Sequence, residues 1–415
     1  MRFYWFHLMP YQDLPADFSQ KYPSVWVTPP SSRLYDPAAG HRMYNEYLDE
    51  LEHAAEAGFD GVCVNEHHQN AYGMMPSPNI MAATLARNTK RSAIVVLGNS
   101  IALYNPPIRV AEELAMLDVM SGGRLVAGFP VGSSMDTNYC YGATPATLRE
   151  KYQEAHDLIM RAWMEPEPFA FNGKYTQLRY VNVWPRPLQK PHPPVWVPGG
   201  GSIETWAWVA ERNYSYSYLS FSGYKRGEQV MQGYWRTLDE MGLKRNPYRG
   251  GFLQLICVAP TDAEAERIYA PHVDYFYDKC LHIAAGFAEA PGYRTVKTIA
   301  AGLSSQFAPT QRQQRQQSGK RMTWKDYIEQ GFIVAGSPAT VREQLKDVIT
   351  RLHVGHLMCL LHLGNMPRET TLMNTDLFAR EVMPHLRGLW SEWRDEWYPK
   401  ALPERAMQTP AARAR

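Results

Sequence analysis

No stretch of this sequence approaches the roughly 18 consecutive apolar residues that a membrane-spanning helix needs. The first ten residues also lack the apolar run and the small-residue cleavage site of a secretory signal peptide. An excess of one charge is missing too, because 43 basic and 41 acidic residues leave a formal net charge of +2. This balance does not suit nucleic acid or an anionic membrane, so a small molecule is the expected partner.

Cysteine is scarce, and its pattern excludes two kinds of stabilised fold. Five widely spaced cysteines do not suit a disulfide framework or a zinc knuckle, and a reducing, cytoplasmic location is expected. They are Cys63, Cys140, Cys257, Cys280 and Cys359. In contrast, 45% of the residues are hydrophobic and 20% are charged, which is enough apolar material for a large core.

Short runs rich in valine, isoleucine and aromatic residues alternate with segments of helical periodicity, which is typical of βα units on a parallel sheet. Eight strands are predicted, at 2–9, 58–64, 93–97, 125–129, 195–197, 214–219, 252–258 and 357–361. Helices are predicted at 44–57, 79–88, 108–120, 147–163, 202–212, 224–241, 339–352 and 368–386. This count predicts an α/β fold of the (β/α)₈ TIM-barrel class with insertions, in preference to an open doubly wound sheet.

The barrel is predicted to form a single domain over residues 1–390, followed by a C-terminal tail at 391–415. One insertion, near 165–194, contains seven prolines and is predicted to be irregular, because that many prolines exclude a regular helix. A second, near 275–332, separates the seventh and eighth strands. Its polar part, 304–321, has the composition of a mobile loop or lid.

The strongest ligand-binding motif, Gly199-Gly200-Gly201-Ser202, follows the fifth predicted strand. In a barrel of this class the active site lies at the carboxyl ends of the strands. Three glycines let the backbone approach a ligand, and Ser202 is expected to cap a helix whose first N–H groups face outward, so the motif predicts a phosphate cradle. Thr205 and the basic Arg149 are expected beside it. The alternative is a glycine turn with an ordinary serine cap.

Histidines follow the second predicted strand, in the segment Asn65-Glu66-His67-His68. They suggest either a general acid/base or a metal pair, while the alternative is a hydrogen bond at the barrel rim. A metal needs more ligands, and the third to seventh strand ends offer Asn, Ser, Gly and Tyr, so no metal is expected. Among the later histidines, His362 alone is placed at the catalytic end.

Several ordered motifs resemble the bacterial luciferase-like, flavin-dependent monooxygenases. Together they extend over most of the chain, from residue 2 to about 386. The most specific are Ala57-Gly58-Phe59-Asp60 through His68, the "AE…LD…S.GR" block within Pro106 to Arg124, Ala210 to Asn213, and Ala335 to Val341.

The resemblance implies a barrel, usually dimeric, that receives reduced FMN (FMNH₂) from a separate flavin reductase. Reaction with O₂ to a flavin hydroperoxide then oxygenates a small organic substrate. It also implies roles for particular residues. His67 matches the active-site histidine, Asn99 and Ser100 match the strand end beside the isoalloxazine, where a non-proline cis peptide often occurs, and the phosphate-binding positions are matched by Arg149, Tyr152, Ser202 and Thr205.

One departure from the family pattern concerns the fourth strand end. Luciferase has a phosphate-binding arginine there, whereas this chain has Val131, which weighs against bioluminescence. Three other functions stay open: a deazaflavin (coenzyme F420)-dependent hydride transfer, a non-catalytic flavin-binding protein, and a metal hydrolase. The oxygenation itself stays open among hydroxylation, Baeyer-Villiger insertion and C–S cleavage.

Overall fold

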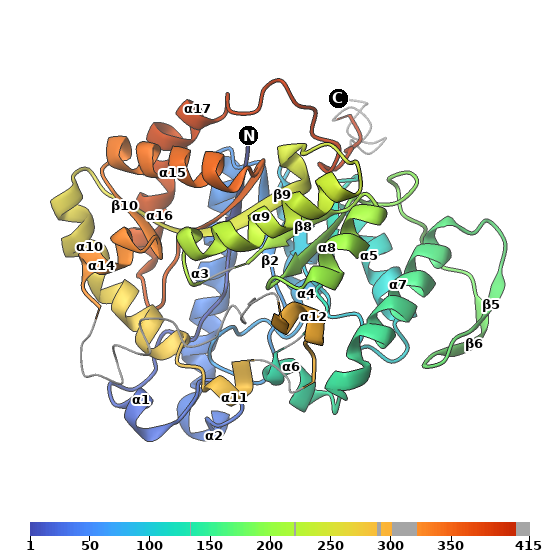
Figure 1. The fold of residues 1–415 in the computed structure, drawn as a ribbon. Coiled ribbons are helices and arrows are strands. Elements are labelled where there is room, and N and C mark those ends of the chain that lie inside the picture. Colours follow the sequence, from blue (N-terminus) through green and yellow to red (C-terminus); the bar gives the residue numbers. More distant parts are fainter. Residues whose placement is uncertain (133, 220, 289–291, 301–321, 404–415) are drawn as a thin grey trace, which may run out of the picture.

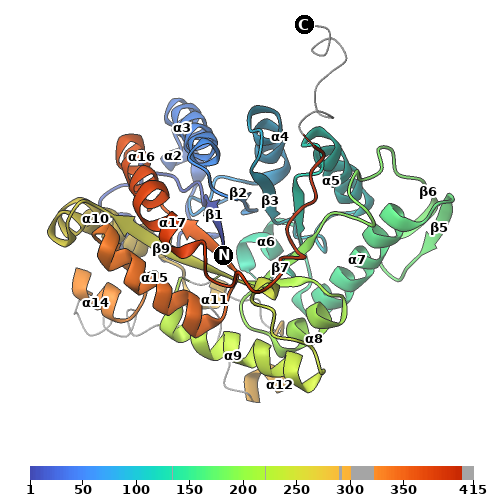
Figure 2. The same ribbon diagram turned by 90° about the horizontal axis from the view of Figure 1, so that it is seen from above.

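The computed structural model describes residues 1–132, 134–219, 221–288, 292–300 and 322–403. Eight parallel strands form a ring, closed by the pairing of β8 with β9 and of β11 with β1 (Figures 1 and 2). The predicted (β/α)₈ fold class is confirmed. In ring order the strands are β1 (Arg2–Phe6), β2 (Gly61–Val64), β3 (Ala93–Leu97), β4 (Leu125–Gly128), β7 (Val195–Gly199), β8 (Ser215–Tyr218), β9 (Gly250–Val258) and β11 (His356–Leu360).

Helices surround the ring, as the view onto the end that holds the N-terminus shows (Figure 2). The structure confirms the predicted bounds of β3 and α5, and the other predicted elements differ from the observed ones mostly at their ends. None of the described helices has the length and apolar composition that crossing a membrane requires. The outer helices are α3 (Pro37–Glu56), α4 (Pro78–Asn88), α5 (Ile108–Met120), α7 (Leu148–Met164), α8 (Ile203–Glu211), α9 (Tyr224–Glu240), α10 (Asp262–Tyr275), α15 (Pro338–Leu352) and α16 (Arg368–Leu377).

The first predicted insertion contains a regular element that the sequence analysis missed. Strands β5 (Phe169–Asn172) and β6 (Gln177–Val181) form an antiparallel hairpin that projects beside α7 (Figure 1). The prediction of an irregular segment was therefore wrong for this part. Prolines lie only outside the two strands, so they exclude a helix without preventing a hairpin. The Glu154 carboxylate on α7 accepts the backbone N–H groups of residues 174–176 and so holds the turn.

A ninth strand, β10 (Ile333–Gly336), also lies in the sheet and was not predicted. Leu255 of β9 pairs with Leu360 of β11 and with Ile333 of β10, so β10 must lie on the opposite edge of β9 from β11. Strand β8 pairs with the same edge of β9, but only as far as Phe252, so the rest of that edge is available to β10. The second insertion is therefore followed by a short strand that adds to the ring. Its predicted loop or lid, 304–321, lies outside the described residues.

Aromatic side chains fill the interior of the ring near its amino end. Rings of Tyr4 and Trp196 lie 5.0 Å apart, and Trp196 stacks on His356 at 4.4 Å. Strands β1 and β7 are not neighbours in the ring, so these contacts cross the interior. Beyond that end, the chain after α16 covers the barrel, and the Trp196 indole N–H donates to the carbonyl of Trp397. The carboxyl end of the strands is therefore the end of the barrel at which a ligand can bind.

The "GR" of the sequence block has a structural role. The Arg124 side chain is buried and donates to five acceptors between α4 and β4. They are the carbonyls of Ala86, Thr89, Ser92 and Ser121 and the Thr89 hydroxyl, at 2.7 to 3.1 Å. Because two of these carbonyls belong to the end of α4, the guanidinium caps that helix and holds it to the barrel.

We expect Arg124→Met to lower the free energy of unfolding by about 3 kcal/mol, because buried acceptors lose their donor. The apparent Tm, followed by circular dichroism, measures this effect. Arg87→Met is the matched control, since Arg87 is an exposed arginine in the last turn of the same helix. Equal Tm values for the two variants would contradict the capping role.

Candidate active site

A cavity opens at the carboxyl ends of the strands, where barrel enzymes hold their active sites. Its empty volume is about 1110 Å³, including the part open to solvent, which is enough for a ligand of cofactor size. One end is polar and lies at the start of α8, and the other is mainly apolar and surrounds His67. The apolar wall includes Phe6, Trp26, Tyr72, Leu97, Leu219 and Phe221.

The polar end brings together three residues that the sequence placed in one cradle. Arg149, in the first turn of α7, donates from Nη2 to Ser202 Oγ (3.0 Å) and from Nη1 to Thr205 Oγ1 (3.2 Å). Ser202 and Thr205 line the cavity, and Arg149 lies directly behind them. Ser202 occupies the N-cap position of α8, but its hydroxyl makes no cap hydrogen bond, so the expected serine cap was wrong.

The glycine motif leaves bare backbone on the cavity wall. Gly199 and Gly200 line the cavity, and a Cβ at Gly199 would lie 3.2 Å from the Tyr216 ring. Gly201 has a φ of +95°, a conformation that other residues rarely adopt, and a Cβ there would lie 3.2 Å from Val230. Side chains at either position would therefore be strained or crowded, whereas an anion has access to the main chain.

A carboxylate lies beside this cradle and connects it to the second insertion. Glu204 accepts hydrogen bonds from the hydroxyls of Ser202 (2.8 Å), Thr298 (2.8 Å) and Thr295. Burial by itself would raise the pKa of Glu204, but these hydrogen bonds outweigh it and lower the pKa to about 2. The carboxylate is therefore charged at neutral pH, and it offsets the charge of Arg149.

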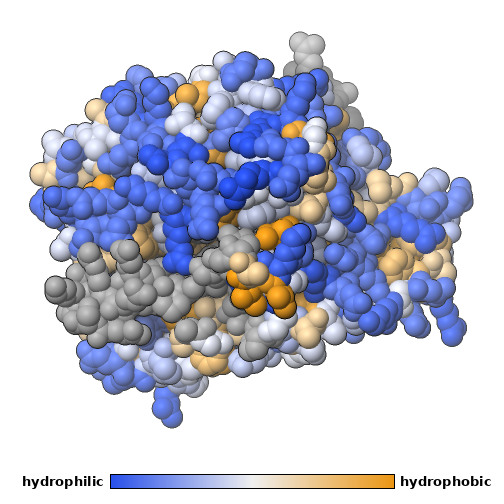
Figure 3. All heavy atoms as spheres, in the orientation of Figure 1, coloured by the Kyte–Doolittle hydropathy of each residue, from blue (hydrophilic) through white to orange (hydrophobic). Residues whose placement is uncertain are grey.

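These bonds fasten α12 (Val296–Ala300) to the start of α8. Thr298 is buried in this contact, while Val296 and Ile299 are 82% and 60% exposed. They lie where Figure 3 shows an apolar patch on a largely hydrophilic face. Just before α12, Tyr293 lines the cavity, and the Arg149 guanidinium lies 5.3 Å from its ring centre. The insertion therefore contributes to the wall of the polar end.

His67 stands at the apolar end, directly after β2 as predicted. Its Nδ1 lies 3.0 Å from Oδ2 of Asp136, a buried residue of α6 (Met135–Cys140). Rings of Trp26 and Tyr72 pack against the imidazole, with centres 6.4 Å and 4.6 Å away. Asp136 was not predicted as a site residue, and its only signal in the sequence is an acidic residue in a short segment after the fourth strand.

The third strand end holds one of its two predicted residues at the cavity. Ser100 lines the cavity, and its backbone N–H donates to Oε2 of buried Glu66 at 2.7 Å. Asn99 is fully buried outside the lining, and its Nδ2 donates to the Tyr104 hydroxyl at 3.1 Å. The non-proline cis peptide that the resemblance implies at this strand end is observed at Leu97–Gly98.

Residues 24–354 match the sequence profile of the luciferase-like monooxygenases. The chain belongs to this family. This luciferase-like monooxygenase is 24% identical over 371 residues to 2,5-diketocamphane 1,2-monooxygenase 2 of Pseudomonas putida, with 83% of this chain and 94% of that protein aligned. It is therefore an oxidoreductase, as the motifs implied.

Solved structures share the fold of this luciferase-like monooxygenase. One is the oxygenating constituent of 3,6-diketocamphane monooxygenase of Pseudomonas putida, a type II Baeyer-Villiger enzyme in complex with FMN. Its TM-score is 0.69 at 17% identity, over 92% of this chain and 98% of that chain. Another is a coenzyme F420-dependent secondary alcohol dehydrogenase in complex with an F420-acetone adduct, with a TM-score of 0.63 at 16% identity over 93% and 99% of the two chains.

Two positions near the polar end of the monooxygenase differ from the phosphate-binding pattern. Tyr152, one turn after Arg149, is buried, and its hydroxyl donates to the carbonyl of Phe129 at 2.9 Å. That proton is not free for a phosphate, so the geometry gives Tyr152 a structural role in place of the expected ligand contact. Val131 lines the cavity and offers no donor from its side chain.

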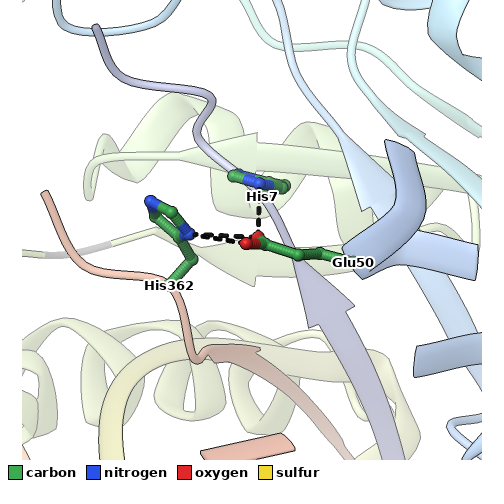
Figure 4. Close-up of side chains that lie close together, drawn as sticks. All are labelled: His7, Glu50 and His362. Carbon is green, nitrogen blue, oxygen red and sulfur yellow. Dashed lines mark hydrogen bonds and ion pairs between the residues drawn. The ribbon is translucent and has the colours of Figure 1, made fainter. Parts of the chain in front are cut away.

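A second cluster of ionisable residues lies buried between β1, β11 and α3 (Figure 4). Glu50 Oε2 lies 3.1 Å from His7 Nε2 and 3.0 Å from His362 Nδ1. These side chains are of metal-ligand type. However, His7 Nδ1 accepts the backbone N–H of Met9 at 3.0 Å, so neutral His7 has its proton on Nε2. A protonated nitrogen cannot bind a metal, and the geometry suits a hydrogen-bonded cluster.

His362 was predicted at the catalytic end, but its contact with Glu50 on α3 was not predicted. Burial disfavours the charged His7 ring and lowers its pKa from 6.5 to about 4. Burial acts oppositely on Glu50, but the charge and hydrogen bond of His362, together with His7, lower the pKa of Glu50 from 4.5 to about 2.

We expect the stability of the protein to fall as the pH is lowered from 6.5 to 4, because the unfolded chain then protonates His7 while the folded protein does not. Over this range the effect of His7 amounts to about 3 kcal/mol. Glu50 adds a loss in the same direction below pH 4.5. The His7→Gln variant, which cannot titrate, should lose less apparent Tm than the wild type between these pH values.

His41→Gln is the control for this experiment, because His41 is exposed on α3. Its Tm should follow the wild-type curve. Parallel curves for all three proteins would show that His7 is protonated equally in the folded and unfolded states.

Proposed function

We propose that this monooxygenase binds reduced FMN in the cavity and uses O₂ to oxygenate a small organic substrate. The observation that carries the proposal is the cradle of Arg149, Ser202 and Thr205 at the glycine motif, which suits one phosphate group. The FMN in the 3,6-diketocamphane relative supports the choice of cofactor. Reduced flavin supplies two electrons, so that one oxygen atom of O₂ enters the substrate and the other leaves as water.

The phosphate would be held by the residues of the polar end. Thr205 offers a hydroxyl, the main chain from Gly200 to Ser202 offers amides at the start of α8, and Arg149 offers its positive charge from behind Ser202 and Thr205. Arg149 is needed for charge as well as geometry, because the charged Glu204 lies beside the same site. Tyr152 is left out of this set, since its proton is already donated.

The flavin ring would lie along the third strand end, where Gly98 and Ser100 face the cavity. Asn99 supports this wall from behind and does not face the cavity. The aromatic and aliphatic wall beyond it would keep water away from the reacting atoms. Exclusion of water is needed because water would divert the reaction to hydrogen peroxide. His67 is the acid/base group of that wall.

We also propose a separate flavin reductase as the source of reduced FMN, in line with the relative described as an oxygenating constituent. A homodimer is supported by exposed apolar side chains on the neighbouring helices α4 and α5, including Ile80 (62% exposed) and Met116 (49% exposed). The five cysteines are free thiols, which supports a cytoplasmic location.

We expect Arg149→Met to weaken FMN binding by roughly 30- to 100-fold, because the positive charge beside the phosphate is lost together with the hydrogen bonds that hold Ser202 and Thr205. Riboflavin, which lacks the phosphate, should bind both proteins equally. Flavin fluorescence titration measures both affinities. Arg161→Met, an exposed arginine on the same helix, is the control and should bind FMN normally. An equal loss of affinity for FMN and riboflavin would show that Arg149 does not act on the phosphate.

We expect His67→Ala to lower kcat by about 100-fold or to divert oxygen to hydrogen peroxide, because an acid/base group is lost from the cavity. FMN affinity should stay within about twofold of the wild type, since His67 lies at the opposite end from the cradle. Oxygen uptake, peroxide and product are measured with a bicyclic ketone, reduced FMN and a flavin reductase. Unchanged, coupled turnover would contradict the role of His67.

The same assay separates the alternatives. The exposed His41→Ala variant should behave as the wild type. A reaction that ignores O₂ and consumes coenzyme F420 would replace the proposal by deazaflavin hydride transfer, as in the dehydrogenase relative. Flavin binding without oxidation of any substrate would indicate a non-catalytic flavin-binding protein.

A further inference from the structure

The pair formed by His67 and Asp136 joins two different strand ends. His67 follows β2, and Asp136 lies on α6, which follows β4. The Asp136 side chain is fully buried, whereas 17% of the His67 side chain is exposed. The imidazole therefore has one nitrogen against a buried carboxylate while the ring lines the cavity.

Asn70 determines which groups donate in this pair. Its Oδ1 accepts the backbone N–H groups of Tyr72 (2.9 Å) and Gly73 (3.2 Å), so its Nδ2 must face the other way. Nδ2 donates to the carbonyl of His68 (2.7 Å) and to Asp136 Oδ2 (3.1 Å). The Asp136 oxygen nearest His67 is thus held as an acceptor, and His67 Nδ1 must be the donor.

The charge on Asp136 is consistent with this arrangement. Burial would raise the pKa of the carboxyl, but the hydrogen bond and charge of His67 outweigh it, and the pKa lies below its ordinary value. Asp136 is therefore a carboxylate at neutral pH. A carboxylate on Nδ1 stabilises an imidazolium more than an imidazole, so it favours uptake of a proton at the other nitrogen.

We propose that Asp136 is a positioning residue that keeps the His67 proton on Nδ1 and leaves Nε2 as a proton acceptor facing the cavity. The proposal rests on the proposed function and specifies the direction of proton transfer. A bound reactant loses its proton, the Nε2–H bond forms, and His67 becomes an imidazolium paired with Asp136. The proton leaves to water when the product is released.

The other ionisable groups described near His67 or in the cavity lining are paired, neutral or basic. Glu66 and His68 bond to each other at 2.7 Å. The Tyr72 ring meets His67 edge-on, and burial raises its pKa well above the usual value, so it stays neutral. Arg294 lines the same cavity. Asp136 is thus the carboxylate that acts directly on the His67 ring.

The first test needs neither cofactor nor activity. Long-range ¹H–¹⁵N spectra of the histidine-labelled protein distinguish the two neutral tautomers, and comparison with His67→Ala assigns the His67 signal. We expect the Nδ1–H tautomer in the wild type and in Asp136→Asn, because the amide oxygen still accepts. Asp136→Ala should move His67 toward the Nε2–H tautomer. An Nε2–H tautomer in the wild type would overturn the proposal.

The second test uses turnover with reduced FMN and O₂. Asp136→Asn should lower kcat by roughly 10- to 100-fold and shift the acidic limb of the pH–kcat profile down by about one pH unit, since the imidazolium loses its counter-charge. FMN affinity should not change. A structural role alone would leave the profile in place, and that result would also overturn the proposal.

Asp157→Asn is the matched control for both tests. Asp157 Oδ1 lies 3.1 Å from Nδ1 of His156, which is the same kind of contact, but this pair lies on α7 outside the cavity lining. The tautomer of His67 and the kinetics should both stay as in the wild type. If the protein shows no oxygenation at all, the proposed function fails, while the spectra still decide the role of Asp136.

Discussion

Closure of the eight-stranded ring is the constraint on which the other features of the molecule depend. Once β8 pairs with β9 and β11 with β1, every strand is buried on both faces, and aromatic rings from β1, β7 and β11 fill the interior. The C-terminal segment covers the amino end. The segments that follow the strands are therefore brought together at the carboxyl end, and their side chains form the cavity.

Opposite charges meet at the polar end of that cavity. Arg149 and Glu204 both contact Ser202, one as a donor to its hydroxyl and the other as an acceptor. Because Glu204 also holds Thr295 and Thr298, the anion site and the second insertion are physically coupled.

Buried carboxylates support the cavity wall from behind in two places. Glu66 accepts the backbone N–H of Ser100, and Asp136 accepts the ring N–H of His67. Each connects the segment after one strand with the segment after another. Residues that line the cavity are thereby held by partners from another βα unit, which restricts their orientation more than a single loop can. The same principle is visible in Arg124, which joins α4 to β4.

The sequence by itself determined the ring and its rim. Hydrophobic periodicity and turn residues are local signals, so the eight strands and most helices follow from residues close in the chain. The positions of His67, Ser100, Ser202 and Thr205 at the strand ends follow in the same way. The same holds for the family, whose motifs are contiguous. The hairpin within the proline-rich insertion and the short strand β10 were missed, because prolines and a four-residue apolar run do not specify a partner strand.

Only the tertiary structure decided the contacts that no motif predicted. Asp136 is 69 residues from His67, Glu50 is 312 residues from His362, and no local pattern reports such contacts. It also weighs against the expected phosphate contact of Tyr152 and against the expected helix cap of Ser202. The Tyr152 hydroxyl donates to the carbonyl of Phe129, and the Ser202 hydroxyl donates to Glu204. Hydrogen-bond direction depends on the complete set of neighbours, and that set exists only after the ring has closed.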